Sequence, residues 1–284
     1  MREPHTLFEA VCDPENLLRA WQQVYGGKSQ RARQRGAGVD GITLAAWEQE
    51  AAVRLAALQA ALWEQSYRPA PLLWFDVPRG EDKAPRRLGI PTVTDRVAQR
   101  AVLNLLEPLW EPVFLSCSHG FRPRRSVFTA IAHVLWYRAR GLTWVVNADI
   151  ADFFNTAQHA TLLAYLAPLG DAQLLDLLTA WLEVGSEQPG QGLAQGAVIS
   201  PLLANIYLHA FDCELVGAGL ALVRYADDFV VMCTDLQQAQ HTLVKVSDTL
   251  AALGLALNSD KTTIVEFGPD LEFLGAKFYD DGRQ

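Results

Sequence analysis

The sequence predicts an α+β fold in which an antiparallel sheet is backed by helices, and two observations lead to this class. The second half of the chain alternates β-branched apolar runs with amphipathic helical patterns, in the order strand, two helices, strand, turn, strand, helix and strand. One apolar run, residues 222–233, contains the adjacent acidic residues Asp227 and Asp228. Strand-favouring residues flank this pair, so the run predicts a hairpin with residues 226–228 at its tip.

Composition and length set broad limits. The chain has 284 residues, half of them hydrophobic and a fifth charged, which is typical of a globular protein with one large or two modest domains. Its longest apolar runs are shorter than the roughly 20 residues that cross a bilayer, and its acidic, proline-containing N-terminus does not resemble a signal peptide. Four scattered cysteines without a CxxC pair argue against a zinc site. We therefore expect reduced thiols, a cytoplasmic location and no membrane partner.

The net charge of −8 conceals an uneven distribution. Residues 1–140 contain 19 Lys and Arg against 14 Asp and Glu, whereas residues 141–284 contain 5 against 18. A basic first half and an acidic second half suggest a phosphate-binding surface and a carboxylate-rich, cation-binding one. An uneven solvated surface would give the same counts, so charge alone does not decide between them.

The first half predicts helices separated by basic loops. In chain order we expect a Gly-rich basic loop at 26–41, a long helix at 44–65 capped by Thr43, a short strand at 72–78, a basic turn at 79–91, a helix from about Thr94 to Leu109 ended by Pro108 and Pro112, and a second basic loop at 118–126.

The second half predicts the strands of the sheet and the helices that cover it. In chain order we expect a buried strand at 143–149, helices at 160–169 and 171–184, a loop at 187–196, a helix with Ser200 as its N-cap and Pro201 as its first residue, the hairpin, a helix at 236–253, a short strand near 255–258, and a terminal hairpin through 262–267 and 271–278.

The acidic pair has a counterpart elsewhere in the chain. A lone acidic pair at a turn is most often only an exposed turn, but the apolar strand 143–149 also ends in an aspartate, Asp149, and Asp152 follows it. If the two strands pair, three carboxylates come together, and such a cluster repels itself unless cations bind it. Mg²⁺ favours a few carboxylates together with substrate phosphates. Two such ions about 4 Å apart are typical of phosphoryl-transfer enzymes.

Eight stretches along most of the chain extend this interpretation. They are GVDGIT, PRRLGIPTVTDRVAQRAVLNLLEP, SHGFRPRRS, VNADIADFFN, AQGAVISPLLANIYLHAFD, RYADDFVVMC, LGLALNSDKT and EFLG. Together, in this order, they resemble the reverse transcriptases of the bacterial group II intron-like branch. The resemblance implies a right-hand polymerase with fingers at 1–140, a palm with the YADD hairpin at 141–284, and no thumb. The acidic chain further suggests a domesticated, CRISPR-associated relative rather than an intron protein.

The resemblance also implies a role for each matching residue. Asp149, Asp227, Asp228 and the Ile150 carbonyl would bind two Mg²⁺ ions, which Mn²⁺ could replace, and Lys261 would be the general acid that joins the aspartates in catalysis. The nucleotide-binding residues would be Lys83, Arg86, Asp152, Phe154, Gln195 and Gly196, with Phe154 excluding a 2′-hydroxyl. The template and primer contacts would be Arg122, Arg124, Arg125, Tyr225, Phe273, Leu274 and Gly275. The implied partners are an RNA template, a DNA or RNA primer, dNTPs, and a protein or fused domain that supplies thumb or integrase function.

Several of these residues have simpler interpretations. Phe154 could be a core residue, Gln195 and Gly196 an ordinary loop, and Lys261 a solvated cation, while the three arginines of 118–126 could be a solvated face. His119 fits a structural role better than a catalytic one. For the whole chain, the alternatives are a non-catalytic, maturase-like RNA-binding protein, which would have no use for the aspartates, and an RNA-dependent RNA polymerase, which Phe154 argues against.

Overall fold

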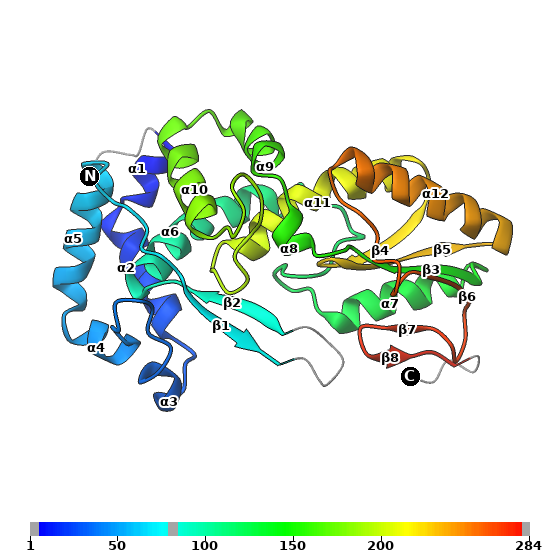
Figure 1. Cartoon of the computed structure of the whole chain (residues 1–284), viewed down its shortest axis with the longest axis horizontal. Coiled ribbons are helices and arrows are strands. Elements are labelled where there is room, and N and C mark those ends of the chain that lie inside the picture. Colours follow the sequence, from blue (N-terminus) through cyan, green and yellow to red (C-terminus); the bar gives the residue numbers. More distant parts are fainter. Residues whose placement is uncertain (1–5, 79–84, 280–284) are drawn as a thin grey trace. The chain divides into compact units, whose positions relative to one another are not determined.

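Contacts divide the chain into two units, each interrupted once in sequence. The computed structural model describes residues 6–78 and 85–279 (Figure 1). The first unit comprises Met1–Leu109 and Leu162–Ser200, and the second comprises Trp110–Thr161 and Pro201–Gln284. These units are defined by packing, so the division into fingers and palm at residue 140 stays a prediction.

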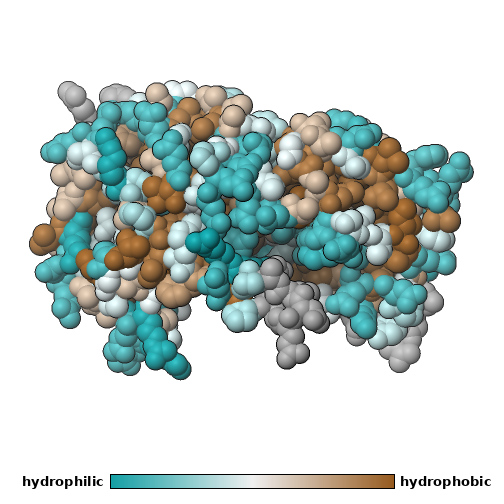
Figure 2. All heavy atoms as spheres, viewed as in Figure 1, coloured by the Kyte–Doolittle hydropathy of each residue, from teal (hydrophilic) through white to brown (hydrophobic). Residues whose placement is uncertain are grey.

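The first unit is mainly helical. Its elements are α1 (Leu7–Val11), α2 (Pro14–Tyr25), α3 (Gln30–Arg33), α4 (Leu44–Gln49), α5 (Ala51–Trp63), the antiparallel strands β1 (Leu73–Val77) and β2 (Arg86–Ile90), α6 (Val93–Trp110), which ends just past the unit boundary, and α10 (Ala172–Val184). Among the described residues, no helix is long and apolar enough to cross a membrane. On the face that Figure 2 shows, hydrophilic and hydrophobic side chains are interspersed.

Two helix predictions in this unit needed correction. The Thr43 hydroxyl does accept a hydrogen bond from the Ala46 N–H, as a cap should, but the predicted long helix is two helices. Glu50 interrupts it with φ −122° and ψ 22°, which lie outside the helical region. Pro108 does not end α6, which continues to Trp110 and stops before Pro112. Pro108 removes only the one hydrogen bond that an N–H at this position would donate to the Asn104 carbonyl, and the helix continues for two more residues.

The second unit contains the predicted antiparallel sheet. Its strands are β3 (Trp144–Asp149), β4 (Ala221–Tyr225), β5 (Asp228–Cys233) and β6 (Thr263–Glu266), in the spatial order β4-β5-β3-β6. The stretch at 262–267 therefore supplies β6, which pairs with β3, and does not join the terminal hairpin. That hairpin is formed by β7 (Glu272–Phe273) and β8 (Ala276–Lys277) alone. The expected strand near 255–258 is a single bridge between Leu257 and Ile150.

Helices cover both faces of this sheet, which confirms the α+β class. Side chains from alternate strand positions, including Val145, Val223, Val230 and Met232, pack against α7 (Val127–Arg138) and the terminal hairpin. The opposite face packs against α11 (Ser200–Gly217) and α12 (Leu236–Ala252). Figure 1 shows α12 and α7 on opposite sides of the sheet. Three short helices, α8 (Phe153–Thr156), α9 (His159–Leu166) and η1 (Ala167–Leu169), follow β3.

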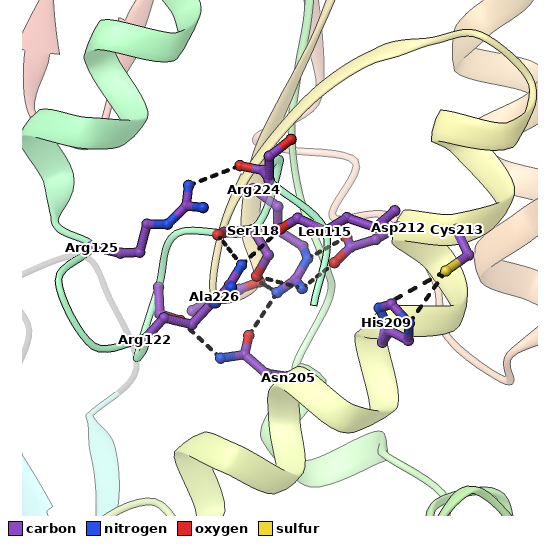
Figure 3. A network of polar contacts seen from close by, with 12 residues as sticks. Leu115, Ser118, Arg122, Arg125, Asn205, His209, Asp212, Cys213, Arg224 and Ala226 are labelled. Carbon is purple, nitrogen blue, oxygen red and sulfur yellow. Dashed lines mark hydrogen bonds and ion pairs between the residues drawn. The ribbon is translucent and has the colours of Figure 1, made fainter. Parts of the chain in front are cut away.

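A buried arginine fixes the position of the β4–β5 hairpin. Arg224 lies in β4 with no solvent exposure and forms an ion pair of 2.5 Å with Asp212 of α11, which is equally buried. All five guanidinium N–H groups donate, because Nε and Nη2 bond the Asp212 carboxylate, Nη1 bonds the Asn205 Oδ1 and the Ala226 carbonyl, and Nη2 also bonds the Ser118 Oγ. Figure 3 shows these groups converging on the guanidinium. The charge is therefore both neutralised and fully hydrogen-bonded, as burial requires.

The loop at 115–126 adds a further strand-like edge beside β4. The Arg224 N–H donates to the Cys117 carbonyl at 2.8 Å, and the His119 N–H donates to the Arg224 carbonyl at 2.8 Å. Gly120 lies so close to the hairpin turn that a Cβ on it would stand 2.3 Å from the Ala226 nitrogen. No side chain fits there. The loop thus supports the turn that carries the acidic pair, and glycine permits the contact.

We expect Arg224→Met to destabilise the protein by about 3–5 kcal/mol, because it leaves the Asp212 carboxylate buried without a partner. Urea denaturation followed by circular dichroism measures this. The double change Arg224→Met and Asp212→Leu should restore much of the loss. Arg54→Met, which breaks the exposed α5 pair with Glu50, is the control and should cost no more than about 0.5 kcal/mol. A loss below 1 kcal/mol for Arg224→Met alone would contradict the assigned role.

Candidate active site

Strand register brings two aspartates face to face. Asp149 is the last residue of β3, and its partner in the antiparallel ladder is Asp228, the first residue of β5. The sequence predicts that these strands pair and bring their aspartates together, and the register shows which residue of the acidic pair faces Asp149. Only two residues, Ala226 and Asp227, form the turn, so pairing already resumes at Asp228. Asp227 stays close through its backbone, since its carbonyl accepts a hydrogen bond of 3.2 Å from the Ile150 N–H.

The two carboxylates influence each other strongly. Burial, a hydrogen bond with Asp149 and the negative charges of Asp149 and Asp227 together raise the pKa of Asp228 to about 7, against a smaller lowering by Lys261. A second negative charge this close disfavours ionisation of Asp228. A cation bound between the two carboxylates would relieve this repulsion, so the site is suited to binding a cation.

Lys261 supplies one positive charge to this site. Its Nζ lies 2.6 Å from the Asp149 Oδ2, so it is an ion-paired residue and not a freely solvated cation. Asn258 also contacts Asp149, because its Nδ2 donates to the Oδ2 at 3.2 Å and its backbone N–H donates to the carbonyl at 2.8 Å. No sequence pattern singles out Asn258 as a site residue. Its position in the turn between α12 and β6, three residues before Lys261, is the only local signal.

The residues present fit a small, hard cation. Asp149 and Asp228 offer carboxylate oxygens from adjacent strands, and Mg²⁺ binds few protein carboxylates while taking its other ligands from water and phosphate. Within residues 6–78 and 85–279, no group of three or more His, Cys, Asp or Glu side chains is arranged to hold a metal. The described site thus contributes a pair of carboxylates, and the predicted third ligand, Asp227, stays a prediction.

Phe154 and Asp152 lie just beyond β3. Phe153, which is buried, packs edge-on against Tyr207 and is the core residue of the FF pair. Phe154 contacts the Phe153 ring at 5.4 Å between centroids and is only partly buried, so it is not a core residue. Asp152 adopts a left-handed φ of 46° at the start of α8, and its Oδ1 accepts a hydrogen bond from the Asn155 side chain.

The remaining nucleotide-binding predictions fall in the first unit. Arg86 is exposed at the start of β2, which therefore begins inside the predicted basic turn. The Gln195 carbonyl accepts a hydrogen bond of 2.8 Å from the Gly89 N–H of β2. Gly196 has a φ of 106°, and a Cβ there would stand 2.7 Å from the Gly89 carbonyl oxygen, so the position requires glycine. Lys83 lies outside the described residues.

The predicted template and primer residues separate into two groups. Arg122 is buried, ion-paired with Glu111 and bonded to the carbonyls of Leu115 and Ser118, so it is a structural residue and has no free donor directed at a phosphate. Phe273 is also a core residue, packed in the cluster beneath the sheet.

The other members of that set are more accessible. Arg124 is exposed, Arg125 is partly exposed with its Nη1 bonded to the Ser116 carbonyl, and Tyr225 pairs with Asp228 across the hairpin. Leu274 and Gly275 form the β7–β8 turn, with left-handed φ values of 54° and 77°.

His119 has a structural environment. Its Nδ1 contacts the Thr129 hydroxyl at 2.9 Å and its Nε2 contacts the His133 Nδ1 at 3.1 Å. Burial, with the positive charge of Arg125 adding to it, lowers the pKa of His119 to about 3. The ring therefore stays neutral at physiological pH and supports the interpretation that it holds the loop rather than transfers protons.

Comparisons with known proteins agree with this geometry. Residues 78–278 match the family model described as reverse transcriptase (RNA-dependent DNA polymerase). Protein YkfC of Escherichia coli K12 is 32% identical over 95% of this chain and 81% of its own length. The group II intron-encoded protein LtrA of Lactococcus lactis is 33% identical over 72% of this chain, which corresponds to 34% of LtrA.

A solved structure extends the similarity to the fold. A chain of the partial Cas6-RT-Cas1–Cas2 complex matches with a TM-score of 0.52 and 25% identity, covering 88% of this chain and 42% of the other. The chain thus spans most of YkfC but less than half of LtrA and of the complex subunit. The family match and the relatives show that this chain, with the paired aspartates of its antiparallel sheet, belongs to the reverse transcriptase (RNA-dependent DNA polymerase) family, in its group II intron-like branch.

Proposed function

We propose that this chain is an RNA-directed DNA polymerase that adds dNTPs to a primer 3′-hydroxyl at the Asp149–Asp228 site. The observation that carries the proposal is the β3–β5 register, which holds the two carboxylates opposite each other with Lys261 against one of them. A protein that only bound RNA would have no use for a carboxylate whose pKa a second, neighbouring carboxylate raises. The proposal therefore favours catalysis over a maturase-like binding role.

Each residue of the site has a defined task in nucleotidyl transfer. The primer 3′-oxygen forms a bond to the α-phosphorus, the bond to pyrophosphate breaks, and the hydroxyl proton leaves. Asp149 and Asp228, with Asp227 and the Ile150 carbonyl as further proposed ligands, would hold two Mg²⁺ ions, which activate the nucleophile and stabilise the leaving oxygen. Lys261, which is ion-paired with Asp149, would protonate the pyrophosphate, and Phe154 would exclude a ribose 2′-hydroxyl. Arg86, Gln195 and Gly196 would hold the triphosphate.

The natural substrates and partners are part of the same proposal. The RNA template and a DNA or RNA primer follow from the family. Because the chain spans about a third of LtrA and 42% of the Cas6-RT-Cas1–Cas2 subunit, we infer that further domains or a partner protein supply thumb or integrase function. A CRISPR spacer-acquisition system or a group II intron would each provide such a domain or partner protein.

Replacing either aspartate should abolish polymerisation. Asp149→Asn and Asp228→Asn each remove a carboxylate from the pair, and we expect a loss of at least about 100-fold in dNTP incorporation, similar to the loss of other transition-state charge contacts. Primer extension on an RNA template with Mg²⁺ measures this. Asp260→Asn, an exposed neighbour in the same turn as Lys261, is the matched control and should extend normally. Equal incorporation by all three variants and the wild type would refute the catalytic assignment.

The carboxylate pair should also make stability depend on pH and on divalent cations. The folded-state pKa of Asp228 is raised to about 7 from 3.8, so ionising it disfavours the folded state, and stability is lost as pH rises between these values. In EDTA at pH 8, Asp228→Asn should therefore raise the melting temperature by about 2 °C or more.

The same variant should change little at pH 4, where Asp228 of the wild type is protonated in the folded state. Adding Mg²⁺ at pH 8 should raise the melting temperature of the wild type more than that of Asp228→Asn, because the cation relieves the repulsion. Differential scanning fluorimetry provides both comparisons. A Mg²⁺ response that is the same in both proteins would mean that the ion does not bind at this pair.

Phe154 should select deoxyribonucleotides. Phe154→Ala removes the ring that would collide with a 2′-hydroxyl, so we expect the rate of rNTP relative to dNTP incorporation to rise by about 10-fold or more, equivalent to about 1.4 kcal/mol of discrimination. Phe153→Ala is the informative comparison, because Phe153 is a core ring and its loss should destabilise the fold by about 3–5 kcal/mol. An unchanged rNTP-to-dNTP ratio in Phe154→Ala would remove its gating role.

A further inference from the structure

One segment of the chain is basic and free of acids although the protein is acidic. Residues 112–148 contain five arginines and no aspartate or glutamate, within a chain of net charge −8. Arg122 is used internally, but no ion pair in the described part of the chain includes Arg124, Arg125, Arg138 or Arg140. Positive charge that no ion pair neutralises is the electrostatic signature of a surface that meets a polyanion.

The same segment exposes aromatic rings. One side of α7, with Ala130, Ile131 and Val134, packs into the core beneath the sheet. The other side carries Phe128, which is 78% exposed, and Trp136, which is 47% exposed. These two rings are eight residues apart, so they lie on one face about 12 Å apart along the helix axis. Side chains this exposed contribute little to the core, and a helix that merely covered the sheet would not need them.

A cation continues the stripe at the end of α7. The guanidinium of Arg140 lies 3.3 Å from the centroid of the Trp136 ring, and its Nη1 donates to the Trp136 carbonyl at 3.0 Å. The pair therefore offers a planar, charged group that is already ordered. Such guanidinium planes stack on unpaired bases and also bind phosphate.

The loop before α7 presents its side chains through an unusual backbone. Phe121 and Arg124 both have a left-handed φ of 60°, a conformation that costs non-glycine residues about 1 kcal/mol or more. Arg122, between them, is anchored to Glu111, Leu115 and Ser118, so the loop is held in this form by its own hydrogen bonds. Phe121 is 46% exposed and Arg124 is exposed as well. The strain thus maintains an outward-facing aromatic residue and an outward-facing cation.

We propose that this surface, the α7 face, binds single-stranded nucleic acid outside the catalytic pair. It consists of Phe121, Arg124, Arg125, Phe128, Trp136 and Arg140. The arginines contact phosphates, and unpaired bases stack on Phe121, Phe128 and the Arg140–Trp136 pair, which is how sequence-tolerant single-strand sites are built. Because Gly120 adjoins the hairpin turn, the loop end of the face is near the aspartates, and α7 leads away from them.

We infer that the ligand is a nucleic acid from the positive charge of the α7 face and from the proposed function. The test therefore measures binding in the absence of catalysis. The full chain is titrated, in EDTA and without dNTPs, into fluorescently labelled single-stranded RNA or DNA of about 15 nucleotides, and anisotropy is recorded at several salt concentrations. Phe128→Ala and Trp136→Ala should each weaken binding by about fivefold or more. Phe128→Tyr, which keeps a ring, should bind as the wild type does.

Charge and position are tested by two further variants. Arg124→Ala should reduce the slope of log K against log salt by about 0.7, the value for one phosphate contact on a single strand. Trp63→Ala removes an equally exposed tryptophan, 55% accessible, from α5, and should change the affinity by less than about twofold. A duplex of the same sequence should not distinguish Phe128→Ala from the wild type, because its bases are already stacked.

The outcomes separate this proposal from the polymerase assignment. Wild-type affinity in Phe128→Ala and Trp136→Ala, with melting temperatures unchanged, would overturn the α7 face. If these variants instead lost binding to polyglutamate while retaining RNA affinity, the face would be a docking site for an acidic protein, which would also overturn the proposal. Weakened single-strand binding in the variants would support the α7 face whatever the primer-extension result, whereas equal dNTP incorporation by Asp149→Asn, Asp228→Asn and the wild type would remove the proposed function alone.

Discussion

The geometry of the carboxylate site depends on one buried ion pair. Arg224 and Asp212 have no solvent exposure, and the five donors of Arg224 reach α11, the 115–126 loop and the turn of its own hairpin. β4 fixes β5, and β5 fixes the register against β3, so the relation of Asp228 to Asp149 follows from this pair. A hydrophobic pair of similar size could be as stable, but it would not specify direction in the same way. We interpret the charge as a device for positioning the turn.

The sequence predicts the parts of the site that local pattern determines. Two apolar strands ending in aspartates are visible as patterns, and their antiparallel pairing follows from the fold class. Which residue of the acidic pair faces Asp149 in the ladder could not be predicted, because a change of one residue in turn length shifts the register and pattern cannot fix turn length. The role of Arg224 was missed for another reason. Arginines are seldom fully buried, and the partner that makes burial possible, Asp212, belongs to a different element.

The basic loop at 118–126 shows how composition alone can mislead. Three arginines near an aromatic residue suggest a phosphate-binding loop, yet Arg122 points inward and holds the loop together, whereas Arg124 points into solvent. The difference depends on backbone dihedrals, which composition does not encode. Likewise, β6 has the composition of a hairpin strand but pairs with β3, since the central strand offers a longer unpaired edge than the two-residue β7 does.

The contact between Gly120 and Ala226 restricts how this protein can diversify. Ala226 has a φ of 58° and is nearly buried, while Gly120 leaves no room for a Cβ against its nitrogen. The atoms that a Cβ at position 120 would strike belong to the backbone of residues 225 and 226, so no change of side chain at position 226 could relieve the clash. Position 120 is therefore confined to glycine whichever residue occupies the turn. A library that randomises the loop should leave Gly120 unchanged, because any side chain there would displace the turn that carries the acidic pair.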